Sequence, residues 1–200
     1  RTLRVEYVEI RGSLMAGEST DVKGYKNFQR YVTFGINLEK ELDGLWSGLH
    51  RSTRSPIRKA MRSGIEIKEL EEVRQLEDYY QLYLETQKRH GSPPHKYELF
   101  KNLYEALNVR GKIKVLLANY HGKLIAGLII FLHNRTIFAW NNVTGTQHRG
   151  LNPTNLLIWN VIEWGVRKGH RIFDLGRTRR GTTIHVFKRR WGGQETHLQD

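Results

Sequence analysis

Residues 136–175 read TIFAWNNVTGTQHRGLNPTNLLIWNVIEWGVRKGHRIFDL. The first eight residues are mostly apolar and predict a strand, and residues 171–175 predict another. Between them, Asn152 followed by Pro153 is typical of a helix start, because Asn caps free N–H groups and proline tolerates the first helical position. The helix is expected to close at Gly169, after a basic last turn. This order of strand, loop, helix and strand predicts a right-handed crossover that returns the second strand beside the first.

The residues on either side of this stretch extend the predicted sheet. Three apolar segments joined by short polar loops predict an antiparallel meander, at residues 113–120, 123–133 and 136–143. After the crossover, we expect a flexible loop at residues 176–181 and a further strand at residues 184–187.

The N-terminal half alternates helices with short strands. Ser55 before Pro56 resembles a capped helix start and predicts a helix over residues 56–62. Apolar residues recur at helical spacing from Tyr97 to Leu107, and this stripe predicts a helix with a packed face. The other expected elements are strands at residues 2–11, 31–36 and 65–68, a helix from about residue 38, and a helix from residues 69–72 to just before Gly91.

The predicted fold class is α+β, a mixed and mostly antiparallel sheet flanked by helices. We expect one domain over residues 51–200, because residues 1–50 are too few to make a separate core. No internal repeat or low-complexity tract is present.

The composition excludes several classes of protein. The 200 residues contain no cysteine, which rules out disulfides, thiolate metal sites and cysteine nucleophiles. Apolar runs such as residues 124–132 are far shorter than the roughly 20 residues of a membrane-spanning helix, and the first residues do not resemble a signal peptide. We expect a cytoplasmic protein without a transmembrane segment. Because the chain begins with Arg1 rather than Met, it is expected to be a piece of a longer protein.

The charge is strongly positive and unevenly distributed. The formal net charge is +13, and residues 165–191 contain nine basic residues against one acidic residue. A second basic cluster comprises Arg51, Arg54, Arg58, Lys59 and Arg62. Such clusters attract polyanions such as a nucleotide, tRNA or a pyrophosphate-linked substrate, although each cluster could also be a solvated basic face.

The loop before Pro153 is a candidate anion site. Free N–H groups and the positive end of a helix favour phosphate, and Arg149 and Gly150 lie where the chain enters this helix. Many helices begin in this way without a ligand. His148, His170 and His185 lack the spacing of metal ligands, so no metal site is expected.

Several motifs of the chain form a recognisable set: the segment TGTQHRGLNPTNLL, the pair DLGR and FKRRWG, and RSPIRKA at residues 54–60. Together they resemble the FemAB-like proteins, GNAT-fold acyltransferases related to the peptidoglycan interpeptide-bridge aminoacyltransferases. The resemblance covers about residues 30–193, and the DLGR and FKRRWG pair is its most specific part. It implies that residues 1–50 are the end of a truncated first GNAT-like domain and a linker, ahead of a GNAT-like acyltransferase domain at residues 51–200.

The resemblance implies amide formation between an amine and an activated acyl group. The donor would be aminoacyl-tRNA, as in the interpeptide-bridge enzymes, or acyl-CoA, as in ordinary GNAT enzymes, with no tightly bound cofactor. The CoA-binding loop of those enzymes carries a second small residue where this chain has Asn152. A side chain there would hinder close approach of pyrophosphate to the backbone, which weakens the CoA alternative.

The resemblance also implies candidate site residues. Phe187 and Lys188 match the Phe-Lys dipeptide of the Fem enzymes, and the Lys188 cation could stabilise a tetrahedral oxyanion. Asp174 could orient Arg177 or accept an amine proton, although a strand-end turn carboxylate is the simpler interpretation. The remaining candidates are Arg149, Gly150, Asn152, Arg177, Arg179 and Arg180 for donor phosphates, and Tyr97 and Trp140 for an acceptor groove, where packing is the simpler role.

Three functional hypotheses remain open from the sequence. The first is an aminoacyltransferase or acyltransferase acting on an amine of a peptidoglycan precursor or another cell-envelope or peptide acceptor. The second is a plain acyl-CoA-dependent N-acetyltransferase. The third is a non-catalytic module on the same fold that binds RNA or an anionic glycan. An anionic, pyrophosphate-linked precursor would also favour peripheral contact with a membrane.

Overall fold

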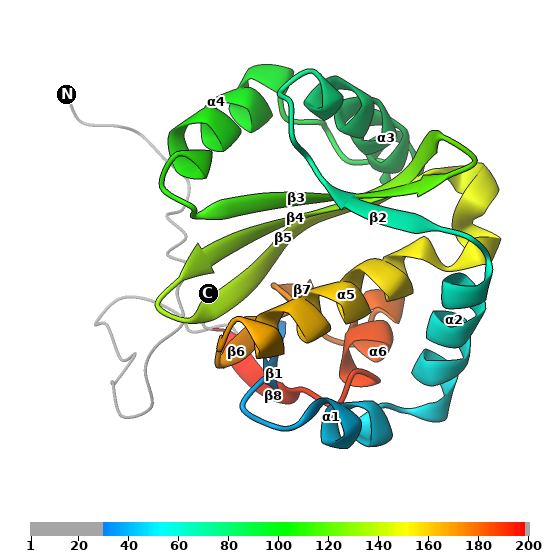
Figure 1. Ribbon diagram of the computed structural model, residues 1–200, viewed down its shortest axis with the longest axis vertical. Coiled ribbons are helices and arrows are strands. Elements are labelled where there is room, and N and C mark those ends of the chain that lie inside the picture. The colour runs from blue at the N-terminus through cyan, green and yellow to red at the C-terminus, as the bar shows by residue number, and fades with distance from the viewer. Residues whose placement is uncertain (1–29, 199–200) are drawn as a thin grey trace.

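The computed structural model describes residues 30–198, which form one eight-stranded mixed sheet with helices on both faces (Figure 1). The strand order is β2-β3-β4-β5-β6-β1-β7, and β8 pairs with β1. In chain order, the strands are β1 (Tyr31–Asn37), β2 (Glu66–Glu69), β3 (Ile113–Tyr120), β4 (Lys123–His133), β5 (Thr136–Thr144), β6 (Ile172–Asp174), β7 (Thr178–Arg179) and β8 (Gln194–Leu198). The predicted α+β class and the meander of β3, β4 and β5 are confirmed.

The sheet opens between β5 and β6. These two strands are parallel, as the predicted crossover requires, but they pair only from Thr136↔Ile172 to Phe138↔Asp174. Beyond this point β5 continues to Thr144, whereas the chain after β6 turns at Gly176, whose φ is +78°. The result is a splay between the two halves of the sheet, with helix α5 (Pro153–Arg167) packed against it.

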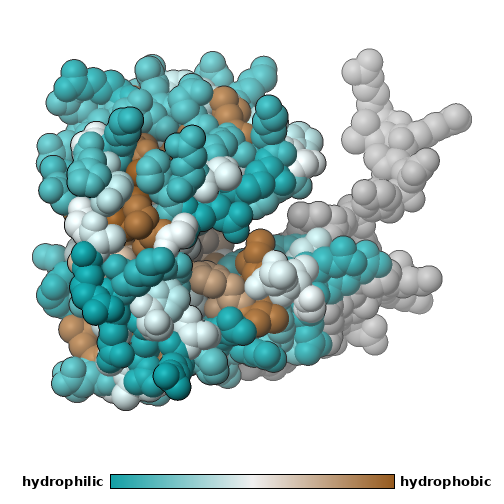
Figure 2. All heavy atoms as spheres, turned by 90° about the vertical axis from the view of Figure 1, so that its right-hand side faces the viewer, coloured by the Kyte–Doolittle hydropathy of each residue, from teal (hydrophilic) through white to brown (hydrophobic). Residues whose placement is uncertain are grey.

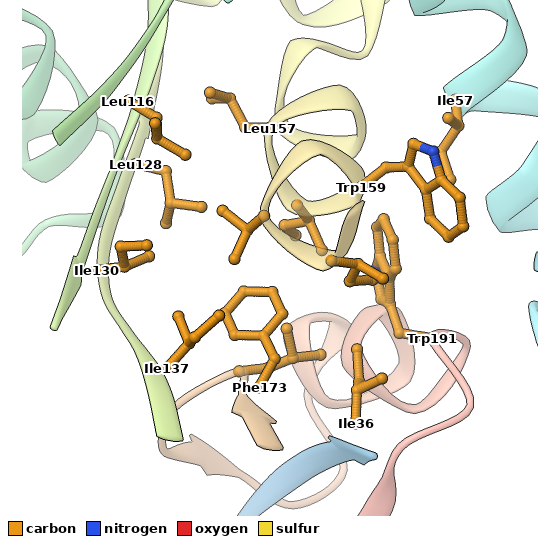
Figure 3. Close-up of a cluster of buried hydrophobic side chains, with 14 of the residues drawn as sticks. Ile36, Ile57, Leu116, Leu128, Ile130, Ile137, Leu157, Trp159, Phe173 and Trp191 are labelled. Carbon is orange, nitrogen blue, oxygen red and sulfur yellow. The ribbon is translucent and has the colours of Figure 1, made fainter. Parts of the chain in front are cut away.

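Two hydrophobic clusters hold the helices against the sheet. The larger cluster lies on the α5 face, where Phe173, Leu157 and Trp159 pack together with Trp191 (Figure 3). Each of these four side chains is at most 4% exposed, and burying such a side chain contributes about 1.5–3 kcal/mol. The second cluster lies under helices α3 (Gln75–His90) and α4 (Tyr97–Asn108).

The strand expected at residues 184–187 is wrong, because these residues belong to helix α6 (Thr183–Arg189). The hydroxyl of Thr182 accepts a hydrogen bond from the His185 amide at 3.2 Å and so caps the helix. Helical geometry turns Phe187 toward Trp191, with ring centroids 6.1 Å apart. Strand β8, which the sequence does not suggest, lies beside β1 instead.

Three helix starts and one loop also differ from expectation. Helix α2 is Arg51–Arg62 and begins before Ser55, with the ring of His50 accepting from the Ser52 amide at 3.1 Å. Helix α1 is Leu42–Gly48, and α3 starts only at Gln75. Asn152 precedes α5 as expected, but its side chain bonds the Gly150 carbonyl and does not cap the helix. Within the expected flexible loop at residues 176–181, β7 pairs with β1.

The expected division between residues 50 and 51 does not divide this sheet. Strand β1 precedes that point and pairs with β6, β7 and β8, which all follow it. The strand expected at residues 2–11 lies outside the described residues. A first domain ahead of this sheet stays a prediction.

Candidate active site

Lys188 reaches from α6 to the point where the sheet opens. Its Nζ donates to the carbonyl of Gly176 at 2.7 Å and to that of Arg177 at 3.2 Å. A Cβ on Gly176 would lie 2.6 Å from the carbonyl oxygen of Ala139 in β5. The amine therefore lies beside the turn that separates β6 from β5. An ammonium has three N–H donors, and these two carbonyls leave one of them available.

Burial tunes the charge of this amine. Removal from water lowers the pKa of Lys188 to about 8, and the neighbouring Asp174 carboxylate opposes part of that shift. The side chain is still mostly protonated at pH 7, so it can donate to a developing oxyanion.

Asp174 fixes the turn on which Lys188 depends. Its Oδ1 accepts from the hydroxyl of Thr33 on β1 and from the Gly176 amide at 2.7 Å. These contacts fit the strand-end turn carboxylate that the sequence also allows. Asp174 and Lys188 therefore both bond the backbone of Gly176, one at its amide and the other at its carbonyl.

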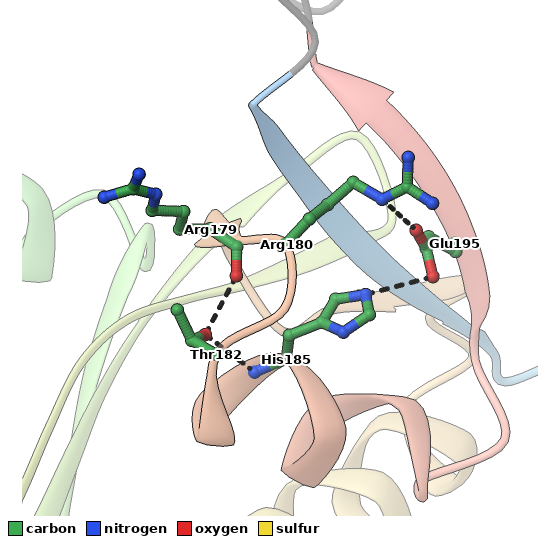
Figure 4. Close-up of polar contacts among 5 residues, drawn as sticks. All are labelled: Arg179, Arg180, Thr182, His185 and Glu195. Carbon is green, nitrogen blue, oxygen red and sulfur yellow. Dashed lines mark hydrogen bonds and ion pairs between the residues drawn. The ribbon is translucent and has the colours of Figure 1, made fainter.

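The three arginines after β6 do not act as one cluster. Arg177 stacks on the Tyr31 ring at 3.5 Å, and Arg180 forms an ion pair with Glu195 at 3.5 Å. Glu195 also contacts the ring of His185 at 3.2 Å (Figure 4). In the same view the exposed side chain of Arg179 extends away from this network. A phosphate contact by Arg180 would have to compete with Glu195.

The candidate phosphate loop lies farther along β5 from Lys188. Arg149 and Gly150 are exposed on a 3₁₀ helix, η1 (Thr146–Leu151), which follows the end of β5 and leads into α5. Ala139 and Thr144 are separated by about 17 Å at roughly 3.3 Å per residue of strand. A single ligand can touch both Lys188 and Arg149 only if it is elongated. Figure 2 shows this side of the molecule hollowed between its two halves, with hydrophobic residues visible in the hollow.

A polar row beside the start of α5 was not found from the sequence. Thr154 on α5 contacts the Thr144 hydroxyl at 2.8 Å and donates to Asn142 Oδ1 at 3.2 Å. Asn142 Nδ2 is buried and has no hydrogen-bond partner. An unmet buried donor costs about 1–3 kcal/mol, and a ligand carbonyl would satisfy it. Isolated asparagine and threonine residues give no sequence signal, because only the fold brings β5 and α5 together.

Three candidate residues serve packing. The rings of Tyr97 and Tyr80 pack with their centroids 5.4 Å apart, and those of Trp140 and Phe100 with their centroids 5.3 Å apart. Both pairs belong to the cluster under α3 and α4. The structure does not bring Tyr97 or Trp140 together with Lys188. Phe187 packs against the cluster on the α5 face and anchors α6.

The described residues limit the remaining chemistry. No helix among residues 30–198 is both long and apolar enough to cross a bilayer. The same part of the chain contains no group of three or more His, Asp or Glu side chains arranged to hold a metal ion.

This mixed sheet, with a long helix packed against its parallel pair, agrees with the GNAT fold that the sequence motifs imply. The sequence model of the family described as an acetyltransferase (GNAT) domain matches residues 50–189, and the chain belongs to this family.

Individual proteins and structures are also similar to this chain. Over 140 aligned residues, the chain is 23% identical to the UDP-N-acetylmuramoylpentapeptide-lysine N(6)-alanyltransferase of Weissella viridescens. The alignment covers 68% of this chain and 41% of that protein. The crystal structure of FemX superimposes with a TM-score of 0.76 at 14% identity, covering 91% of this chain and 64% of that one. The C-terminal domain of a putative lysylphosphatidylglycerol synthetase from Agrobacterium fabrum superimposes with a TM-score of 0.62 at 13% identity. That superposition covers 87% of this chain and 60% of the other. This chain thus spans less than two thirds of each.

Proposed function

We propose that this chain is the catalytic domain of an aminoacyltransferase. It would move an amino acid from aminoacyl-tRNA to an amine of a peptidoglycan precursor. The observation that carries the proposal is the Lys188 amine, held by the Gly176 carbonyl at the opening of the sheet with one donor left. Similarity to an alanyltransferase named for a lysine N6 acceptor supports this choice of acceptor class.

The reaction needs stabilisation of one developing charge. The acceptor nitrogen attacks the ester carbonyl carbon, and a nitrogen–carbon bond forms while the carbonyl oxygen becomes an oxyanion. The free N–H of Lys188 donates to that oxygen, and Asp174 holds the supporting turn. The ester carbon–oxygen bond then breaks. The nitrogen loses a proton and the ribose oxygen gains one, which leaves an amide and deacylated tRNA.

None of the site residues described above, within residues 30–198, is proposed to bind the acceptor amine. We propose that a preceding domain completes the acceptor site in the longer protein, as the greater length of the similar proteins allows.

A second candidate donor is acyl-CoA. Membership of the GNAT family and the exposed loop at Arg149 and Gly150 favour it. The acceptor amine would attack the thioester carbonyl in the same way, with Lys188 donating to the oxyanion and the CoA thiolate as leaving group.

Transfer assays separate these alternatives. The full-length protein is incubated with UDP-N-acetylmuramoylpentapeptide and either alanyl-tRNA or acetyl-CoA, and the acceptor mass is followed. A gain of one alanyl residue supports aminoacyl transfer, whereas a gain of one acetyl group supports the acyl-CoA alternative. No gain with either donor, together with tight RNA binding, would favour a binding module without turnover.

A further inference from the structure

The second basic cluster of the sequence is outside the site described above. Arg51, Arg54, Arg58 and Arg62 follow one another at intervals of three or four residues, so their side chains share one face of α2. With Ser55 they line an open hollow of about 360 Å³. Arg51, Arg58 and Arg62 are exposed, and Arg54 is partly buried.

This arginine face carries uncompensated charge. Helix α2 contains no acidic residue, and none of its arginines forms an ion pair within residues 30–198. The Arg58 guanidinium lies 5.3 Å from the centre of the Trp46 ring, which restrains it without neutralising it. Arginines held in this way are suited to bidentate contact with phosphate.

Helix α2 lies between the two parts of the candidate active site. Helix α2 contacts η1, which carries Arg149. At its N-terminus, Thr53 Oγ1 donates to the Arg190 carbonyl at 3.1 Å, just after the helix that carries Lys188. The buried face of α2 therefore packs beside both parts of the site, and its arginine face points outward next to them.

We propose that the α2 arginine face binds the sugar–phosphate backbone of RNA and so positions the donor tRNA. The proposal rests on the proposed function in one respect, that the donor is aminoacyl-tRNA. Phosphate contacts of this kind orient a nucleic acid without reading its sequence. The reactive end of the tRNA would then extend past η1 toward Lys188.

RNA fits this face better than an anionic membrane. An amphipathic helix binds a bilayer by inserting its apolar face, but Ile57 and Ala60 of α2 are fully buried in the protein. Arginine rather than lysine dominates the hollow.

Anisotropy of 5′-labelled deacylated tRNA tests the proposal on the full chain at about 50–200 mM salt. Arg54→Gln/Arg58→Gln should weaken binding at least about tenfold. Loss of two phosphate contacts should also reduce the slope of log K against log salt by about 1.4–1.8. Arg51→Gln/Arg62→Gln, whose side chains are exposed, should act similarly if the first variant folds poorly.

The matched control is Arg110→Gln/Lys112→Gln, which removes the same charge beside the start of β3, at the opposite end of the strands from η1. Affinity in the control should change less than about twofold. Equal losses in the α2 and control variants, or no loss in either α2 variant, would overturn the proposal. So would unchanged tRNA binding combined with lost binding to phosphatidylglycerol vesicles.

The same assays test tRNA binding by the arginine face separately from aminoacyl transfer. Normal alanyl transfer by α2 variants that bind tRNA like the wild type would refute only the arginine face. Conversely, α2-dependent tRNA binding without alanyl transfer would refute only the aminoacyltransferase.

Discussion

The Lys188 amine donates to the Gly176 carbonyl at 2.7 Å and thereby joins α6 to the turn after β6. The same turn is held from the other side, because the Gly176 amide donates to Asp174. The position of the amine is therefore set by the backbone of the splayed sheet and not by a flexible surface contact.

Lys188→Met should lower kcat about 10²–10³-fold, the usual cost of losing one oxyanion donor. The thermal midpoint should change little, because removal of a cation from a largely buried position offsets the loss of its hydrogen bonds to the Gly176 and Arg177 carbonyls. Steady-state transfer kinetics and thermal unfolding measure both effects. The control is Arg189→Met, an exposed neighbour that should keep normal activity. Wild-type kcat in Lys188→Met would refute the assigned role.

The rate should fall as pH rises through about 8. Burial lowers the pKa of Lys188 to about 8, and only the protonated amine is fully effective as an oxyanion donor. Profiles of kcat against pH with saturating substrates measure this decline. In Lys188→Arg the guanidinium stays charged, so residual activity should lack the decline near pH 8. The same decline in both proteins would mean that another group titrates.

The free energy of unfolding of the wild type should rise with pH, whereas its transfer rate falls. Lys188 binds its proton more weakly in the folded chain than in the unfolded chain, where the pKa is near 10.5. The resulting cost, about 3 kcal/mol, is fully present below pH 8 and disappears as pH rises to about 10.5. Urea unfolding should therefore show the stability of the wild type rising by about 3 kcal/mol relative to that of Lys188→Met between these pH values. A constant difference would contradict the assigned pKa.

Gly176→Ala should destabilise the fold more than an ordinary left-handed glycine substitution. Its φ is +78°, and the new Cβ would lie 2.6 Å from the Ala139 carbonyl oxygen. Gly181→Ala is the matched control, with φ +76° and open space around the Cβ. The control should lose about 1–2 kcal/mol, and Gly176→Ala at least about 1 kcal/mol more. Equal losses in urea unfolding would mean that the close approach to β5 is relaxed.

Asn142→Ala should raise the KM for the acyl donor about 3–10-fold, the worth of one hydrogen bond. Its free energy of unfolding should change by less than about 1 kcal/mol, because loss of the Thr154 hydrogen bond to Oδ1 is offset by removal of the unpartnered Nδ2 donor. Asn141→Ala is the contrasting variant. It removes the side-chain acceptor of the buried Tyr79 hydroxyl at 2.7 Å and leaves only the Asn141 backbone carbonyl at 3.1 Å, so it should destabilise the fold by about 1 kcal/mol. An unchanged KM in Asn142→Ala would place the amide outside the donor site.

Local patterns predicted much of the fold. Alternating loops and apolar runs located β3, β4 and β5, and Pro153 located α5. The sequence misled at α6, where Ile184 and Val186 favour a strand by propensity but the Thr182 cap and packing around Trp191 select a helix. Strand β8 has no apolar alternation and exists only because β1 lies beside it.

The site was predicted unevenly for similar reasons. Lys188 and Asp174 were proposed from short motifs, and the structure brings them to one turn. Their supports, Thr33 and the Gly176 carbonyl, depend on pairing between distant segments, which no local pattern encodes. Tyr97 and Trp140 were aromatic candidates whose ring contacts assign them to packing.

The strand that supports the lysine turn is contributed from the opposite end of the chain. Thr33 and Asp174 are 141 positions apart, and β1 also pairs with β8, near the end of the described residues. During synthesis the strands of the meander emerge in succession, but β1 must wait for β6, β7 and β8, which are translated after the meander. Contacts of such long separation slow folding. Assembly of the half of the sheet that carries Lys188 is thus postponed until β8 has been translated.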